Sequence, residues 1–170
     1  MKTSFLIPFI LGLLLCQSCI VFEEEDTGDF PLGSSYLPVI MKRADFETTT
    51  VLESNPRAII NSGKIYVKGN YIFINEVNEG FHLINNSDPS NPQNIGFIKV
   101  FGSSDLSIKN NVIYANNATD LLAFTIDETS QSLTITKRVA NVFPQIWSPE
   151  GFAYYNLEED DIIVNWEPLN

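Results

Sequence analysis

The two cysteines are the residues whose spacing most clearly points to chemistry. Cys16 and Cys19 lie three positions apart, directly after an apolar run, in the stretch LLLCQSC. A redox Cys-x-x-Cys pair needs a strand before it and a helix after it, and the sequence indicates neither. Two cysteines this close together at an apolar N-terminus also make no disulfide framework for a chain of 170 residues.

The N-terminal residues instead have the order of a secretory signal. Lys2 supplies the positive charge, and residues 5–15 form an apolar segment broken only by one proline and one glycine. This segment is shorter than the ~20 apolar residues that a transmembrane helix requires. We therefore expect the segment to direct export without spanning the membrane.

The residue before each cysteine distinguishes Cys19 from Cys16. Cleavage directly before a cysteine, with a small residue preceding it, is the pattern of a bacterial lipoprotein signal. Ser18 is small and precedes Cys19, whereas the bulky Leu15 precedes Cys16. We therefore predict that residues 1–18 are a signal peptide and that Cys19 carries the lipid.

An acidic run follows the predicted lipidation site almost at once. Residues 20–35 read IVFEEEDTGDFPLGSS, acidic at first and then rich in Gly, Pro and Ser. Such a composition is typical of a solvated, self-repelling tether, which we assign to 19–35. The run also resembles the acidic export tag that some Gram-negative anaerobes place after the lipidated cysteine. That resemblance implies the outer membrane and its outward-facing leaflet, with an inward-facing anchor as the alternative.

Charge and composition exclude some classes of partner. The net charge is −11, from 21 acidic and 10 basic residues. Such a chain repels phosphate backbones and anionic headgroups, so we expect no nucleic-acid partner and no electrostatic membrane docking. Apolar residues make up 44%, enough for one folded domain, which we place at 36–170.

The folded part has the punctuation of an all-β protein. Short apolar runs alternate with turn residues such as Gly69-Asn70 and Asn78-Glu79-Gly80, which tolerate positive φ. Two prolines exclude 87–94 from a central strand. The predicted strands of this first meander are 64–68, 71–77, 80–86 and 95–100.

The meander recurs about forty residues later, a repeat length typical of propeller blades. From the third strand on, the offset is 40 and places Phe81 on Leu121, and 133–139 closes the second unit. We predict two four-stranded antiparallel units, at 63–100 and 104–139. At an offset of 41, the matched residues are Lys68 and Lys109, Asn70 and Asn111, Ile72 and Ile113, Asn75 and Asn116, Phe73 and Tyr114, and Glu79 and Asp120.

The first unit resembles the LVIVD-repeat family. The stretch FHLINNSDPSNPQNIGFI (81–98) has an apolar strand, Asn85 at the family's Asp position, and a turn matched by Ser87, Asp88, Pro89 and Pro92. The second unit departs from this pattern, since Thr125 replaces the Asp and the two prolines are missing. The resemblance covers about 60–140 and implies a propeller-like bacterial lipoprotein. It transfers no catalytic residue.

Two units are fewer than the four or more blades of a closed propeller. The runs 36–42 and 160–168 read as two further strands, and one option for the first is to join a neighbouring sheet. We therefore expect an open propeller or a small β-sandwich. The sequence leaves three explanations open: a compact two-blade body, an assembly with another chain, or a shortened relative of a longer protein.

Few residues of the folded part point to catalysis. His82 is the single histidine, and we expect it to lie half-exposed on a strand. No serine has the context of a nucleophile turn, and a zinc site needs several His or Cys ligands. The acids of 156–162 lack the spacing of a calcium loop. We therefore predict no cofactor, no metal and no enzyme activity, with a hydrolase as the least favoured reading.

Aromatic residues gather in the C-terminal segment 140–170. They either close the small β core with large rings or offer a platform for carbohydrate. The candidate ligand-binding residues are Trp147, Tyr154, Tyr155 and Trp166.

The sequence thus predicts a lipid-anchored, surface-exposed β-repeat protein that acts as a binding or structural module. Its expected partners are the membrane, reached through the lipid, and a protein or a carbohydrate. The alternatives are a carbohydrate-binding accessory lipoprotein and a shortened remnant of a longer LVIVD-repeat protein.

Overall fold

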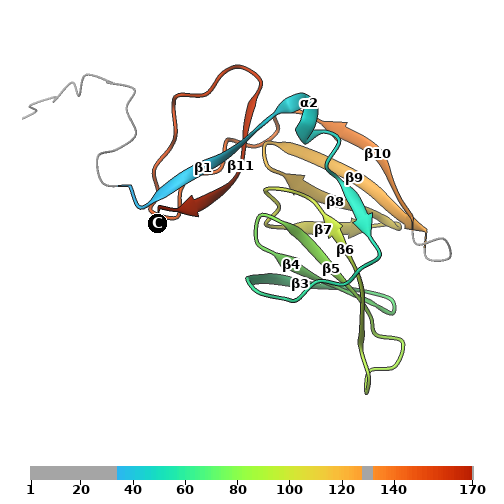
Figure 1. Ribbon diagram of the computed structural model, residues 1–170. Helices are drawn as coiled ribbons and strands as arrows, with labels where there is room; N and C mark the ends of the chain where they lie inside the picture. Colours follow the sequence, from blue (N-terminus) through green and yellow to red (C-terminus); the bar gives the residue numbers. More distant parts are fainter. Residues whose placement is uncertain (1–33, 128–131, 170) are drawn as a thin grey trace, which may run out of the picture.

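The computed structural model describes residues 34–127 and 132–169, which form an all-β body (Figure 1). Its strands build several antiparallel sheets, none of them closed. This confirms the predicted fold class. The predicted signal peptide, Cys19 and residues 20–33 of the predicted tether lie outside the described residues, whereas Ser34 and Ser35 at its end are described and bond to Glu150. Within the described ranges, α2 (Arg43–Phe46) is a single helical turn. No helix of these ranges is long and apolar enough to cross a bilayer.

The first repeat forms a five-stranded sheet. Four of its strands follow the predicted meander, and their order along the sheet is β3, β4, β5, β6. A short strand that the sequence did not predict, β2, pairs with the far edge of β6. The strands are β2 (Val51–Glu53), β3 (Ser62–Lys68), β4 (Tyr71–Glu76), β5 (Gly80–Asn85) and β6 (Gln93–Lys99).

The second repeat forms a four-stranded sheet in the order β7, β8, β9, β10. Its first tight turn uses Asn110 and Asn111, both at positive φ, where the first repeat has Gly69 at φ 55°. Asn is among the few residues that tolerate this conformation. The strands are β7 (Leu106–Lys109), β8 (Val112–Asn117), β9 (Asp120–Asp127) and β10 (Ser132–Val139).

The change of offset from 41 to 40 falls in the turn before the third strand. Glu76 pairs with Gly80 in the first repeat, and Asn117 pairs with Asp120 in the second. The second turn is therefore one residue shorter, and Asp120 corresponds to Gly80. The predicted match of Glu79 with Asp120 is wrong for this reason.

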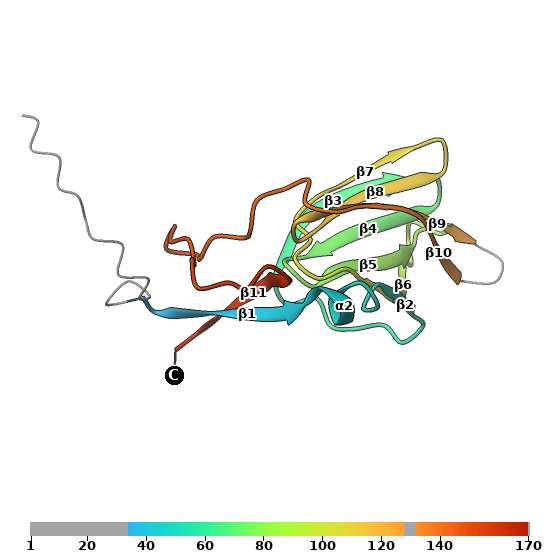
Figure 2. The ribbon, with the colours of Figure 1, turned by 90° about the horizontal axis from the view of Figure 1, so that it is seen from above.

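The two sheets pack face to face, and the main core lies between them (Figures 1 and 2). Burying these side chains removes apolar surface from water, which is the main favourable term in folding. Polar contacts join the β3 edge of the first sheet to the β7 edge of the second sheet: Lys64 and Tyr66 both bond to Asp105, and Lys68 bonds to Asn111. The buried core residues are Phe73, Phe81, Leu83, Ile98, Val100, Leu106, Ile113, Ala115, Leu122 and Phe124.

The first and last strands pair with each other and join neither repeat. β1 (Tyr36–Lys42) and β11 (Asp161–Pro168) form an antiparallel two-stranded ribbon, which Figure 1 shows beside the two sheets. The sequence predicted both strands but not this pairing. A second core, built around Phe46, Ala118, Ile162 and Val164, packs the ribbon against the turns of the second repeat.

A buried carboxylate fixes these parts to one another. Asp120 is fully buried at the start of β9 and accepts hydrogen bonds from Arg43 (3.1 Å), Arg138 (2.8 Å) and the Asn141 backbone N–H (3.1 Å). Arg43 belongs to α2 (Arg43–Phe46), which follows β1 directly. Burial raises the pKa of Asp120, but the two guanidinium groups and the N–H outweigh it, so the pKa falls below its ordinary value.

Asp120→Asn is predicted to lower the free energy of unfolding by about 2 kcal/mol. The substitution keeps the shape of the side chain but removes the carboxylate that pairs with Arg138 and leaves Arg43 with Glu47 as its charged partner. Both arginines reach solvent in part, which makes the cost smaller than for a fully buried pair. Chemical denaturation of both proteins measures the difference. Glu159→Gln, at an exposed position, is the control and is expected to change stability by less than about 0.5 kcal/mol.

The effect of Asp120 also has a definite pH dependence. Its pKa is lower in the folded state, so its contribution is present above the unfolded pKa of about 4 and is lost as pH falls through the folded pKa. The difference in the free energy of unfolding between wild type and Asp120→Asn should therefore become smaller in acid. A gap that widens below pH ~4 would contradict this assignment.

Candidate functional site

The segment 140–160, between β10 and β11, carries most of the candidate aromatic residues (Figure 1). It is tied down against β11 through a side-chain amide: Gln145 donates to the Asp161 carbonyl (2.8 Å) and accepts from the Ile163 N–H (2.9 Å). Farther along, the Ser148 N–H donates to the Phe152 carbonyl (2.9 Å) and closes a tight turn. The loop is therefore held at several points along its length.

The structure separates the four candidate aromatic residues. The side chains of Trp147 and Tyr155 are 62% and 76% exposed, so each presents a ring to solvent. Tyr154 is half-buried. Trp166 is buried in β11, opposite Pro38 of β1, and its indole N–H donates to the Ile146 carbonyl (3.0 Å). Its burial and its bonded indole N–H thus separate Trp166 from the exposed rings of the predicted platform.

A hollow of about 700 Å³ lies between the outer face of the second sheet and the start of this loop. The three amide side chains on its rim, Asn78, Asn116 and Gln145, all make hydrogen bonds within the chain. A sugar needs several converging polar groups, so the hollow suits an apolar occupant better. Its apolar lining includes Leu106, Tyr114, Leu121, Phe143, Pro144 and Ile146.

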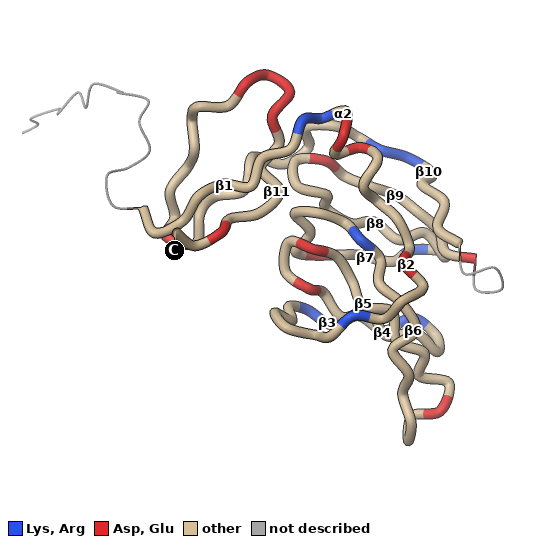
Figure 3. The backbone as a smooth tube through the Cα atoms, in the orientation of Figure 1, with Lys and Arg blue, Asp and Glu red and all other residues tan. Residues whose placement is uncertain are grey.

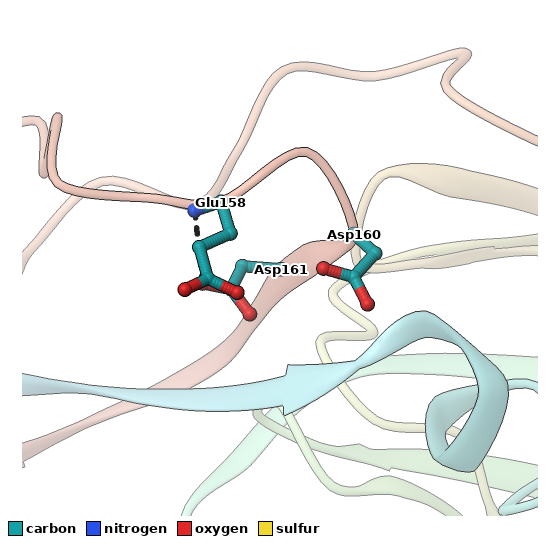
Figure 4. Close-up of side chains that lie close together, drawn as sticks. All are labelled: Glu158, Asp160 and Asp161. Atoms are coloured by element: carbon teal, nitrogen blue, oxygen red, sulfur yellow. Dashed lines mark hydrogen bonds between the residues drawn. The ribbon is translucent and has the colours of Figure 1, made fainter.

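Three acids gather at the turn before β11. Oxygen atoms of Glu158, Asp160 and Asp161 all lie within 4.8 Å of one another, and Figure 4 shows the three carboxylates together. The ammonium group of Lys42 bonds to all three carboxylates, and these bonds raise the pKa of Lys42 above its ordinary value. A lysine thus supplies the positive charge, and the acids serve to join β1 to β11 (Figure 3).

His82 is fully buried, so the prediction of a half-exposed histidine is wrong. Its Nε2 lies 2.8 Å from Glu76, whose carboxylate also accepts the backbone N–H groups of Ile60 and Asn61. The segment 54–61, which links β2 to β3, supplies these donors and covers this part of the sheet. Burial raises the pKa of Glu76, but the bonds from His82 and the two N–H groups lower it below the ordinary value.

The described part of the second repeat has no equivalent of the His82–Glu76 pair and has an apolar residue at the position of His82. The pairing registers match Glu76 with Asn117 and His82 with Leu122, which belongs to the main core. His82 also meets Phe97 edge to face, with the ring centres 5.0 Å apart. The pair is thus a buried structural link, closed to a substrate.

His82→Leu is predicted to lower the free energy of unfolding by about 2 kcal/mol, because the buried Glu76 carboxylate loses a donor. His82→Gln, which keeps an N–H donor, should lose less. Thermal and chemical unfolding of the three proteins measure the order. A His82→Leu protein at least as stable as wild type would contradict the stabilising role of the His82–Glu76 bond. It would indicate that an apolar side chain, like Leu122 in the second repeat, suits this position as well.

Another surface was missed at the sequence level. Ile65 and Val67 of β3 are 64% and 68% exposed, although both are β-branched and apolar. The run KIYVK carries apolar residues on both faces of the strand, which is the pattern of a strand covered on both sides. The sequence KIYVK therefore indicates both the strand and a covered outer face.

No family model, no curated protein and no solved structure matches this chain. The resemblance of 81–98 to the LVIVD-repeat family therefore stays a prediction.

Proposed function

We propose that the protein is a lipid-anchored β-repeat protein of the outer membrane, displayed at the cell surface, where it acts as a non-catalytic binding module. One observation carries the anchor: the Ser18-Cys19 step directly after an apolar segment too short to span a bilayer. The acidic 19–35 stretch supports a tether between lipid and body. The LVIVD-like turn at 81–98 supports membership of that repeat family.

The binding role draws its support from the loop 140–160. Trp147 and Tyr155 hold exposed rings on a segment that internal hydrogen bonds restrain, so little conformational freedom is lost when a ligand stacks on them. The buried state of His82 removes the single imidazole from contact with any substrate. Both facts favour a binding module over a hydrolase.

Cys19→Ala is expected to abolish lipidation and to release the protein from the membrane fraction. The thiol is the acceptor of the lipid, and no other part of the proposal holds the chain at the bilayer. Fractionation and mass spectrometry of the mature N-terminus measure both effects. Cys16→Ala is the matched control and should remain lipidated. A Cys19→Ala protein that still fractionates with membranes would refute the anchor.

A carbohydrate-binding accessory role is the second candidate, favoured by the two exposed rings. Trp147→Ala is expected to weaken glycan binding by about tenfold or more, because stacking rings are commonly binding hot spots. A glycan array followed by titration of each hit measures the change. Ile60→Ala, an even more exposed apolar position in the segment 54–61, is the control. An array without hits, or equal binding by Trp147→Ala, would exclude this role.

A further inference from the structure

The outer face of the first sheet, on the side away from the second sheet, is apolar and open at its β3–β4 side. Ile65 pairs with Ile74 and Val67 with Ile72, so the four side chains share one face. Neighbouring Ile59 and Ile60 are 46% and 87% exposed. Monomeric proteins rarely leave contiguous apolar surface of this kind in water. We call these six residues the isoleucine face.

The internal repeat shows what such a face does when it is covered. At the same offset of 41, Ile65 and Val67 correspond to Leu106 and Ile108, while Ile72 and Ile74 correspond to Ile113 and Ala115. In the second repeat these positions pack against the first sheet as part of the main core. Where a neighbouring sheet exists, Leu106, Ile113 and Ala115 are buried. Where none does, Ile65 and Val67 are exposed and Ile72 and Ile74 are half-buried.

The surface that covers the second repeat also has a counterpart. Phe73, Phe81 and Leu83 of the first sheet form the covering side of the core. At offsets of 41, 40 and 40 they correspond to three residues on the outer face of the second sheet, Tyr114, Leu121 and Ala123. Tyr114 is 37% exposed, and two of the three, Tyr114 and Leu121, line the 700 Å³ hollow. We call these three residues the tyrosine face.

We propose that the isoleucine face of one chain docks on the tyrosine face of a second copy of the same chain, so that copies assemble head to tail. The contact would repeat the packing that already joins the two sheets within each chain. Because the hollow is apolar and its rim amides are already bonded, apolar side chains are its fitting occupants. The proposal does not depend on the lipid anchor or on a carbohydrate ligand.

The charged residues fit this arrangement. Within the chain, Lys64 bonds to Asp105, and the offset of 41 makes these two residues equivalent. Moving the contact on by one repeat therefore places Asp105 of one copy against Lys64 of the next, again with opposite charges. Likewise the Lys68–Asn111 bond becomes a contact between Lys109 and Asn70, with the same residue types. Both polar contacts keep their chemistry across the new junction.

The interface joins two different surfaces, so the assembly is heterologous and grows until it closes. Propellers close with 4–8 blades, and each copy supplies two. We therefore expect a ring of about two to four copies.

The first measurement is the protein mass of the full chain in detergent, by light scattering that separates protein from detergent. Wild type is expected to be oligomeric, and the double variant Ile65→Glu, Val67→Glu to be monomeric. Both residues are exposed in the single chain, so the variant should still fold and unfold in one cooperative transition as a monomer. Leu37→Glu, at an exposed position of the β1–β11 ribbon, is the control and should remain oligomeric. A monomeric wild type would overturn the proposal.

The second measurement tests the head-to-tail order. The variant Tyr114→Glu, Ala123→Glu blocks the tyrosine face and should also be monomeric. Mixed with the isoleucine-face variant, it should form dimers of one copy each and nothing larger, because each variant keeps one working face. Association of the tyrosine-face variant with itself would instead indicate an isologous contact between isoleucine faces. A stable complex of wild type with a different protein in place of the ring would also refute self-assembly.

Discussion

The ion pair network around Asp120 is the constraint on which the arrangement of the parts depends. One buried carboxylate receives Arg43 from the helical turn after β1, Arg138 from β10 and the backbone of the loop that leaves β10. The main core holds the two sheets together, but it does not determine where the ribbon lies. Asp120 does so together with the second core, because a buried carboxylate tolerates few positions of its partners. The loop that carries Trp147 and Tyr155 begins next to Asp120, where the Asn141 N–H donates to this carboxylate.

The repeat itself was readable from the sequence, since its signals are local. Alternating apolar residues and the turn residues at 69–70 and 78–80 each determine structure over a few positions. Identities such as Asn75 and Asn116 also had a physical cause that the sequence did not reveal. Both amides hold the chain between the repeats: Asn75 donates to the Ser103 carbonyl and Asn116 to that of Gly102.

The remaining features were not predictable because they depend on contacts between distant segments. The burial of His82 follows from the segment 54–61 folding over β5, and nothing in the local pattern indicates that cover. Trp166 looked like a ligand-binding residue until its strand was placed against the loop at Ile146. The exposure of Ile65 is the converse case: its sequence is that of a covered strand, and the chain itself provides no cover. Such a conflict between local pattern and surroundings often marks an interaction surface.

The pairing of β1 with β11 has a consequence for the order of folding. Tyr36 of β1 lies opposite Pro168 of β11, so the first strand of the body can form its hydrogen bonds only when the last strand is present. Contacts of such sequence separation form late, whereas each four-stranded meander can close from neighbouring residues. The chain would thus collapse first into its two stacked sheets and leave β1 unpaired until β11 is available. The final closure would then join the two ends of the body in one step.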